Sequence, residues 1–249
     1  MDIKTWGWRK DSRDDRDIPF KAVALGLKNI ANVVYLIKPP VKHQLDLGSC
    51  VFNGIIEEIE SVMIQNNAIP PVVLSRLFAY WNYRSQYANV NEDCGAFPRD
   101  AHKSIAKDGI CLESSWTYDT ERFTERPPDE CWVEAQKYKI KSYHSMRSLD
   151  DMMECIAEGW PFGCGLAIYK SFMSDEVERT GIVPMPTPGE EFLGGHYVFF
   201  WGYDRHKQIF HGQNSWGSEW GNNGSFTIPF DYLTNKQLAD DQWTIRTLM

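Results

Sequence analysis

The sequence has no long hydrophobic run. None of its apolar stretches approaches the roughly 18 residues that suggest a membrane-spanning helix, so we expect no membrane association. Residues 1–17 are polar and lack the apolar core of a secretory signal peptide. We therefore expect a cytoplasmic protein.

Closely paired cysteines are also missing. The six cysteines are scattered along the chain without a Cys-x-x-Cys pair, which argues against a zinc ribbon. An even number of cysteines would suit disulfides, but a chain of 249 residues can be stabilised by its own core. We expect reduced thiols, as in a cytoplasm.

Positive charge is in short supply. Lysine and arginine total 26 against 34 acidic residues, for a net charge of −8, and no dense basic stripe stands out. We therefore expect no binding to nucleic acid. Apolar residues make up 43% of the chain, which is enough for a sizeable core in one domain or in two subdomains around a cleft.

The N-terminal region differs in composition from the rest. Residues 1–38 are polar and then mixed, and we treat them as a leader segment. The charged stretch at residues 11–17 is most simply a solvated surface, and Ile18 before Pro19 favours extended backbone. The leader is therefore expected to be extended.

Helical spacing dominates the first half of the remaining chain. Apolar residues after Cys50 recur every three to four positions until Asn66, which predicts a helix. Two further helices are predicted over residues 74–86 and 98–109. We expect a mainly helical subdomain over residues 39–140.

The second half changes character. Four stretches rich in aromatic and β-branched residues, punctuated by glycine and proline, are typical of antiparallel strands. They are residues 161–169, 196–204, 208–216 and 224–230. Residues 141–249 are thus expected to form a mainly β subdomain. A helical half followed by a strand-rich half predicts the α+β class, with the active site in the cleft between them.

Four residues together suggest nucleophilic catalysis. A lone cysteine is most often a buried thiol, but Cys50 stands at a predicted helix start, where the helix dipole favours the thiolate. His196 can supply a neighbouring imidazolium, and the Asn214 carbonyl can orient that ring. The Gln44 amide and the Cys50 N–H can stabilise an oxyanion.

The order of these motifs resembles the papain-like cysteine peptidases. Gln44 stands six residues before Cys50, His196 follows two glycines, and Asn214 opens an Asn-Ser-Trp-Gly sequence that contains Trp216. The resemblance implies a papain-like fold of two subdomains and a monomer that needs no metal or organic cofactor. It also implies a polypeptide substrate.

The resemblance further assigns roles to individual residues. Cys50 is the expected nucleophile, His196 its base, Asn214 the residue that orients His196, and Gln44 an oxyanion donor. The residues expected to contact substrate are Gly48, Ala96, Phe97, Pro98, Gly195, Tyr197 and Trp216. Phe97, Pro98 and Tyr197 resemble walls of the family's S2 pocket and predict an apolar P2 residue.

Several positions depart from the family pattern. Leu47 and Val51 stand where the family usually has a cysteine and a tryptophan, so the familiar disulfides are not available. Ala96 replaces a frequent glycine. The leader is too short for the usual helical propeptide and resembles the leaders of compact bacterial and viral members. We predict that it crosses the cleft and limits access to Cys50.

Two other functions fit parts of the pattern. A catalytically silent papain-like binding protein would share the fold, but it would not need the complete set of Cys50, His196 and Asn214. A non-peptidase acyl-transfer enzyme, such as a transglutaminase or an amidase, more commonly pairs its histidine with aspartate. The remaining histidines are expected at the surface or in the core.

Overall fold

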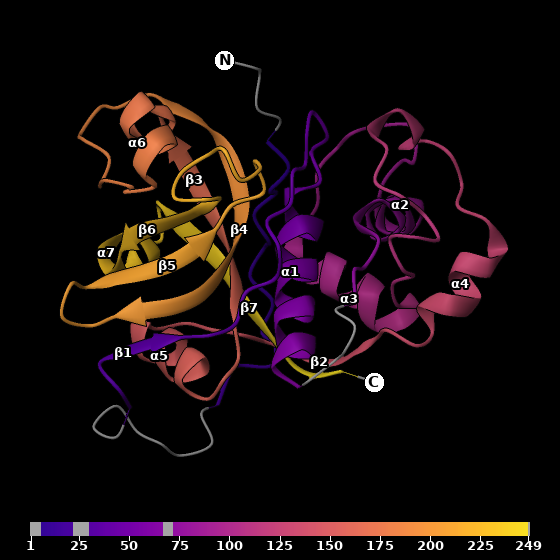
Figure 1. Ribbon diagram of the computed structural model, residues 1–249, viewed down its shortest axis with the longest axis horizontal. Helices are drawn as coiled ribbons and strands as arrows, with labels where there is room; N and C mark the ends of the chain where they lie inside the picture. Colours follow the sequence, from indigo (N-terminus) through magenta and orange to yellow (C-terminus); the bar gives the residue numbers. More distant parts are fainter. Residues whose placement is uncertain (1–5, 22–29, 67–71, 249) are drawn as a thin grey trace.

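The chain folds into a helical half and a β-sheet half that lie side by side (Figure 1). The computed structural model describes residues 6–21, 30–66 and 72–248. Helix α1 (Cys50–Gln65) lies at the boundary between the halves and packs against both. The predicted α+β class is confirmed.

The helical half contains the three predicted helices. Helix α1 begins at Cys50 as predicted, and all its residues from Cys50 to Val62 are buried. The other helical elements are α2 (Arg76–Tyr87), α3 (Pro98–Asp108), a 3-10 turn η1 (Thr120–Arg122) and α4 (Asp129–Ala135). Gly109 ends α3 at a φ of 77°, a conformation that glycine adopts without strain.

The β half is built around one antiparallel sheet. Its strand order is β2-β7-β3-β4-β5-β6, with β1 pairing additionally to β4. The strands are β1 (Val33–Tyr35), β2 (Ile140–Ser145), β3 (Phe162–Tyr169), β4 (Phe192–Asp204), β5 (Ile209–Gln213), β6 (Ser225–Pro229) and β7 (Ala239–Leu248). The four predicted strand regions correspond to β3, β4, β5 and β6. Strands β1, β2 and β7 were not predicted.

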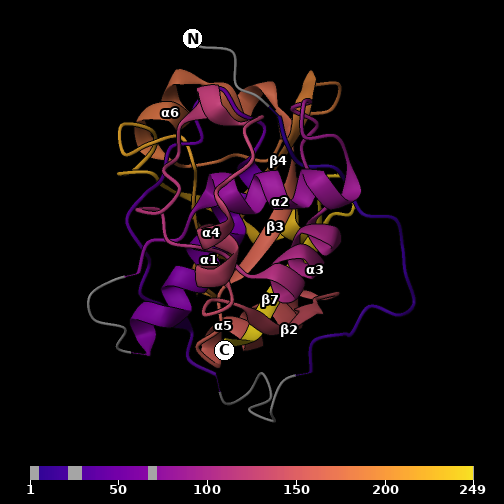
Figure 2. The same ribbon diagram turned by 90° about the vertical axis from the view of Figure 1, so that its right-hand side faces the viewer.

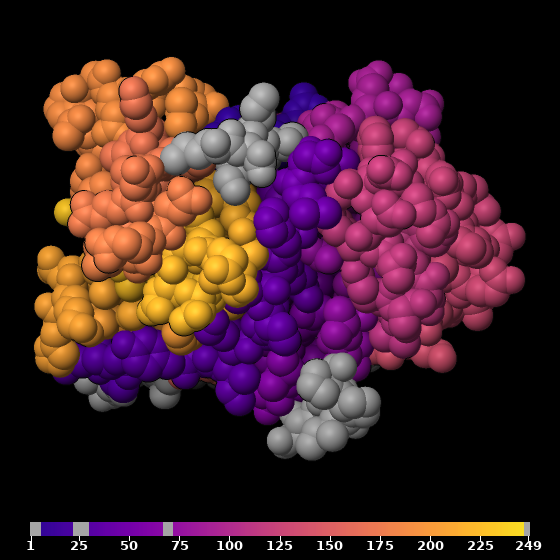
Figure 3. All heavy atoms as spheres, turned by 45° about the horizontal axis from the view of Figure 1, so that its top comes forward, coloured from indigo at the N-terminus to yellow at the C-terminus, as the bar shows by residue number. Residues whose placement is uncertain are grey.

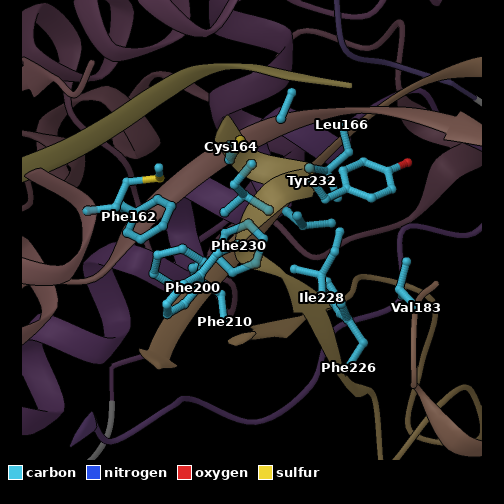
Figure 4. Close-up of a cluster of buried hydrophobic side chains, with 14 of the residues drawn as sticks. Phe162, Cys164, Leu166, Val183, Phe200, Phe210, Phe226, Ile228, Phe230 and Tyr232 are labelled. Carbon is cyan, nitrogen blue, oxygen red and sulfur yellow. The ribbon is translucent and has the colours of Figure 1, made fainter. Parts of the chain in front are cut away.

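Short helices complete the β half. They are α5 (Leu149–Ala157), the 3-10 turn η2 (Lys170–Met173), α6 (Asp175–Thr180) and α7 (Phe230–Thr234). Aromatic side chains fill the core between sheet and helices, among them Phe162, Phe200 and Phe210 (Figure 4). The Phe162 and Phe200 rings stack 5.1 Å apart.

The leader is joined to the sheet rather than separate from it. Val33, Val34 and Tyr35 pair with Tyr203 and its neighbours on β4. Residues 1–38 therefore contain one strand of the β half. In Figure 2 the helices α2 and α3 face the viewer with the sheet behind them. Among the residues described, no helix is both long and apolar enough to cross a bilayer.

Candidate active site

Cys50 lies where the helical half meets the sheet. It is the first residue of α1 and is fully buried. The turn before it is tied down on both sides. The Gly48 N–H donates to the Asp93 carboxylate at 2.8 Å, and the Ser49 hydroxyl shares a 2.6 Å hydrogen bond with Tyr118.

Burial controls the ionisation of the Cys50 thiol in this structure. It raises the pKa of Cys50 to about 11, against the smaller opposing effect of backbone N–H groups of Tyr197, Gly7 and Val51. The expected depression of the pKa at the helix start is therefore absent while the site is covered. The protonated thiol prevails at neutral pH.

The imidazole of His196 is held by side chains. Its Nε2 lies 2.7 Å from the Asn214 Oδ1, and its ring stacks on Trp216 with centroids 4.7 Å apart. Asn214 is fixed in turn, because its N–H donates to the Gly224 carbonyl at 2.8 Å. All three side chains are buried, so water has little access to the His196–Asn214 hydrogen bond.

Gln44 connects the helical half to the Asn214 loop. Its backbone N–H donates to the Ser215 carbonyl at 2.8 Å, and its Oε1 accepts the Ser215 hydroxyl proton at 2.7 Å. The Gln44 Nε2 donates to the Leu47 carbonyl at 3.1 Å. These bonds hold the Gln44 amide beside the segment that delivers Cys50.

The four predicted catalytic residues thus come together at one junction. Tyr197, whose N–H lies close enough to the Cys50 thiol to lower its pKa, directly follows His196 on β4. Ser215, which bonds to Gln44, directly follows Asn214. A thiol, an imidazole and two amide side chains therefore lie close to the junction of α1 and β4.

The leader enters this junction. The Trp6 ring lies 6.3 Å from the His196 ring and 6.2 Å from the Trp216 ring, edge-on to both. The N–H of the next residue, Gly7, lies close enough to the Cys50 thiol to lower its pKa. A Cβ on Gly7 would lie 2.0 Å from the Gly48 carbonyl oxygen, so only glycine fits this close approach.

Backbone hydrogen bonds continue along the leader. Trp8 forms a parallel bridge with Ala96. The Gly7 carbonyl accepts the Ala96 N–H at 2.8 Å, and the Arg9 N–H donates to the Ala96 carbonyl at 3.0 Å. On the opposite wall the Trp8 N–H donates to the Gly195 carbonyl at 3.1 Å. Figure 3 looks onto this end of the molecule, where both halves flank the N-terminal third of the chain.

The predicted substrate contacts are distributed unevenly along this leader. Ala96 and Gly195 lie on its two sides, as described above. The Phe97 ring lies 4.5 Å from the Arg9 guanidinium. Pro98 is buried as the first residue of α3, and Gly48 faces Gly7. Trp216 contacts Trp6.

The Tyr197 side chain extends from the same strand as Gly195. It is fully buried, and Cβ atoms on Gly54 and Gly163 would lie 2.9 Å and 2.4 Å from its ring and hydroxyl. Its side chain therefore packs between α1 and the sheet, because alternate residues of a strand face opposite ways. Gly165, against which the Trp8 indole rests, pairs directly with Tyr197, so the Tyr197 side chain and the indole share one face of the sheet.

The charged part of the leader is anchored rather than solvated throughout. Arg99 of α3 binds both carboxylate oxygens of Asp17, at 2.6 Å and 2.7 Å. The Arg99 backbone N–H donates to Asp11 at 3.0 Å. Asp14, by contrast, pairs only locally with Arg16 at 2.6 Å. The prediction of a solvated charge run is thus wrong for Asp11 and Asp17.

Several residues around the leader were not predicted from the sequence. Trp6, Gly7 and Trp8 form an aromatic-glycine-aromatic group in an otherwise polar segment, and this was a visible signal. Asp241 on β7 accepts the Trp8 Nε1 proton at 2.8 Å. No local pattern marks Asp241, because its contact bridges the two ends of the chain.

Thiols and acidic groups elsewhere show no metal site. All six cysteines are free. Within the described ranges no three histidine, cysteine or acidic side chains converge in a way that could hold a metal ion. The arrangement suits covalent catalysis by a thiol.

The chain resembles known cysteine peptidases along most of its length. The family model described as papain family cysteine protease matches residues 35–242. An uncharacterized peptidase C1-like protein of Acanthamoeba polyphaga mimivirus is 33% identical, with 98% of this chain and 87% of the relative covered. Cathepsin Z of Onchocerca volvulus is 33% identical over 36% of this chain and 29% of its own length.

Solved structures agree with these sequence relationships. The crystal structure of xylellain, a cysteine protease from Xylella fastidiosa, superposes with a TM-score of 0.91 at 32% identity, covering 100% of this chain and 99% of xylellain. The digestive procathepsin L 3 of Tenebrio molitor larval midgut has a TM-score of 0.73 at 17% identity, covering 98% and 76%, and supports the fold alone. The chain belongs to the papain family and is a papain-like cysteine peptidase.

Proposed function

We propose that the chain hydrolyses peptide bonds through a Cys50–His196–Asn214 triad. The observation that carries this proposal is the buried His196–Asn214 hydrogen bond of 2.7 Å under the Trp216 ring. His196 directly precedes Tyr197 on β4, and the Tyr197 N–H lies close enough to the Cys50 thiol to lower its pKa. A general base with a fixed ring orientation is what a thiol nucleophile requires.

The proposed reaction has two halves. Cys50 attacks the scissile carbonyl as a thiolate, and the Gln44 amide with the Cys50 N–H stabilises the oxyanion. His196 protonates the leaving amine and an acyl-enzyme forms. His196 then removes a proton from water, which attacks the thioester and releases the acid.

We also propose that the leader blocks this site until it is displaced. Gly7 and Trp6 contact Cys50 and the His196 ring, where a scissile bond must lie. The bridge of Trp8 to Ala96 uses the backbone groups expected to bind a substrate chain. Because the leader is tethered, its effective concentration is high and weak contacts suffice. The free thiols support the further proposal of a reducing, cytoplasmic location.

Labelling of Cys50 tests the catalytic proposal. Treatment with an epoxysuccinyl or iodoacetamide probe, followed by peptide mapping, should modify Cys50 in clear preference to the other five thiols. Cys50→Ala should abolish hydrolysis of a fluorogenic peptide while leaving the circular dichroism spectrum unchanged. Cys94→Ala is the matched control, because Cys94 is the least buried of the six thiols. Undiminished hydrolysis by Cys50→Ala would refute the triad.

A further inference from the structure

The Trp8 indole fills a pocket in which two of the lining residues, Gly165 and Gly195, have no side chain. A Cβ on Gly165 would lie 2.0 Å from the indole, and one on Gly195 would lie 2.8 Å from it. The ring therefore rests on the bare backbone of β3 and β4. Ala96, which pairs with the Trp8 backbone, is fully buried beside it.

A carboxylate receives the polar edge of this ring. The Asp241 Oδ2 accepts the Trp8 Nε1 proton at 2.8 Å and the Asp11 N–H at 2.9 Å. Both donors belong to the leader. The nearby lysine, Lys10, forms its ion pair with Asp240 instead, at 2.8 Å. Displacement of the leader thus removes two donors from Asp241 and opens the pocket that contains it.

A substrate bound in place of the leader would present a side chain to the same pocket. Extended peptides bind such walls through main-chain hydrogen bonds, and alternate side chains enter the pockets. The groups that bind Trp8 are the Ala96 and Gly195 backbones, and Gly7 next to it faces Cys50. The side chain in the Trp8 pocket is then that of P2, one residue from the scissile bond.

We infer that Asp241 determines P2 specificity by selecting side chains with a hydrogen-bond donor or positive charge at the tip, namely lysine, arginine and tryptophan. The inference rests on the proposed function of the groove. It changes the sequence-based expectation of a simply apolar P2 residue. The pocket walls contact the apolar part of the P2 side chain, and the Asp241 carboxylate selects the group at its tip.

The physical reason is the cost of an unpartnered carboxylate. An apolar P2 residue would remove water from Asp241 without supplying a donor, which is unfavourable. A donor at the correct depth restores the bond that Trp8 makes. A hydrogen bond to a charged group contributes enough for a selectivity of roughly 10- to 100-fold.

Matched substrate pairs test this selectivity. Fluorogenic peptides identical except at P2 should be compared by kcat/KM, with lysine against norleucine and tryptophan against naphthylalanine. The members of each pair have a similar apolar part, and only one of them carries the donor. The ratio within a pair is independent of leader occupancy, because a blocked site lowers both values equally. We expect at least about tenfold preference for the donor in each pair.

Two variants separate charge from hydrogen bonding. Asp241 has a φ of 55°, a conformation that asparagine tolerates well, so Asp241→Asn should fold. It should lose the lysine preference and keep the tryptophan preference, since the amide oxygen still accepts. Asp240→Asn is the control and should change both ratios less than twofold. Equal ratios for wild type and Asp241→Asn in the lysine pair would overturn the inference.

A measurement without catalysis keeps the inference separable from the proposed function. Trp8→Phe keeps an aromatic ring in the pocket but is smaller and has no donor, so hydrogen exchange of the amides at position 8 and at Arg9 should accelerate about tenfold or more. Unchanged exchange would overturn the role of Asp241 even if no peptide is hydrolysed. If the proposed triad is wrong, the wild-type protein should show neither peptide hydrolysis nor preferential labelling of Cys50. The amide exchange of Trp8→Phe should still be faster than that of the wild type.

Discussion

The thiol side and the imidazole side of the site are supported differently. The backbone N–H groups of Gly7, Val51 and Tyr197 lie close enough to Cys50 to lower the pKa of its thiol. His196 is held by two side chains, the Asn214 amide and the Trp216 indole. The Asn214 and Trp216 side chains belong to the β half, whereas part of the backbone support at Cys50 comes from the leader through Gly7.

This difference explains why only one side was fully visible in the sequence. Contacts made by side chains require particular residue types and can therefore be recognised as a motif, such as the Asn-Ser-Trp-Gly sequence after β5. A backbone N–H carries no residue-type requirement, so the contact of Gly7 with Cys50 leaves little trace beyond the glycine itself. The leader also touches both sides, through Trp6 at His196 and Gly7 at Cys50, and so its displacement affects both.

The largest effects should come from the imidazole side. His196→Ala removes the acid–base group and should lower kcat by about 10²–10⁴-fold. Asn214→Ala leaves the imidazole but frees its ring, and should cost about 10²-fold or less. Steady-state hydrolysis of one fluorogenic peptide measures both. If Asn214→Ala cost more than His196→Ala, Asn214 would have a role beyond orientation.

Gln44 provides the next test, because it belongs to the thiol side but acts through a side chain. Gln44→Ala should lower kcat by about 10²–10³-fold, as expected for one oxyanion donor. Ser215→Ala is the matched control. It removes the hydroxyl that donates to the Gln44 Oε1 at 2.7 Å but leaves the amide, and should cost far less. Equal losses would show that Gln44 acts only through its hydrogen bond to Ser215.

Gly7→Ala tests the contact that the leader makes with Cys50. The added methyl would lie 2.0 Å from the Gly48 carbonyl oxygen, so the leader must shift away. Iodoacetamide labelling of Cys50 should accelerate about tenfold. Burial is the main cause of the raised pKa of Cys50, so the pH at which labelling becomes fast should also fall.

Arg13→Ala is the control for Gly7→Ala. Its side chain is 87% exposed and pairs with Asp15, which is 83% exposed. This leader substitution should leave the rate and pH dependence of labelling unchanged. A Gly7→Ala protein that labels at the wild-type rate would show that the leader does not limit access.

The hold of the leader should weaken as pH rises. Burial, and next the charge of Asp241, raise the pKa of Asp11 from 3.8 to about 7 with the leader in place. The closed form therefore binds a proton more tightly than the open form. Its extra stability is complete below about pH 4 and is lost as pH rises through 7.

Hydrogen exchange measures this pH dependence. After correction for intrinsic chemical exchange, the Trp8 and Arg9 amides of wild type should exchange about tenfold faster at pH 8 than at pH 5. Asp11→Asn resembles the protonated carboxyl and should flatten this change. An equally steep change in Asp11→Asn would assign the effect to another group.

The parts of the fold that could be predicted are those with local patterns. Apolar spacing located α1 to its first residue, and aromatic and β-branched runs located β3 to β6. Strand β7 was missed because it begins with Ala239, Asp240 and Asp241, which are untypical of strands. Helix α5 was missed although Ser148 and Asp151 form a capping box at its N-terminus.

The site followed the same rule. Gln44, Cys50, His196 and Asn214 were predicted because each stands in a short motif with a chemical reason. The Trp8 pocket was not, because Gly165 and Asp241 contribute to it from different strands, and an aspartate at positive φ has no local pattern. That the Tyr197 side chain forms a wall of the P2 pocket stays a prediction, because the direction of a side chain depends on strand register.

A last comparison concerns two glutamates behind the thiol. Glu57 and Glu60 are both buried on α1. Glu60 pairs with Lys42 at 2.7 Å, whereas Glu57 accepts a hydrogen bond from Gln213, just before Asn214, at 3.0 Å. Burial raises the pKa of Glu57 to about 8, so the folded protein holds this proton more tightly than the unfolded chain. Stability from Glu57 is therefore complete below about pH 4.5 and is lost as pH rises through 8, at up to about 1.4 kcal/mol per pH unit.

Glu57→Gln should flatten the decline in the free energy of unfolding between pH 5 and 8, measured by urea denaturation, with kcat nearly unchanged. Glu60→Gln should instead destabilise by about 3–5 kcal/mol, because it leaves Lys42 buried without its anion. An unchanged slope in Glu57→Gln would show that Glu57 is ionised in the folded protein.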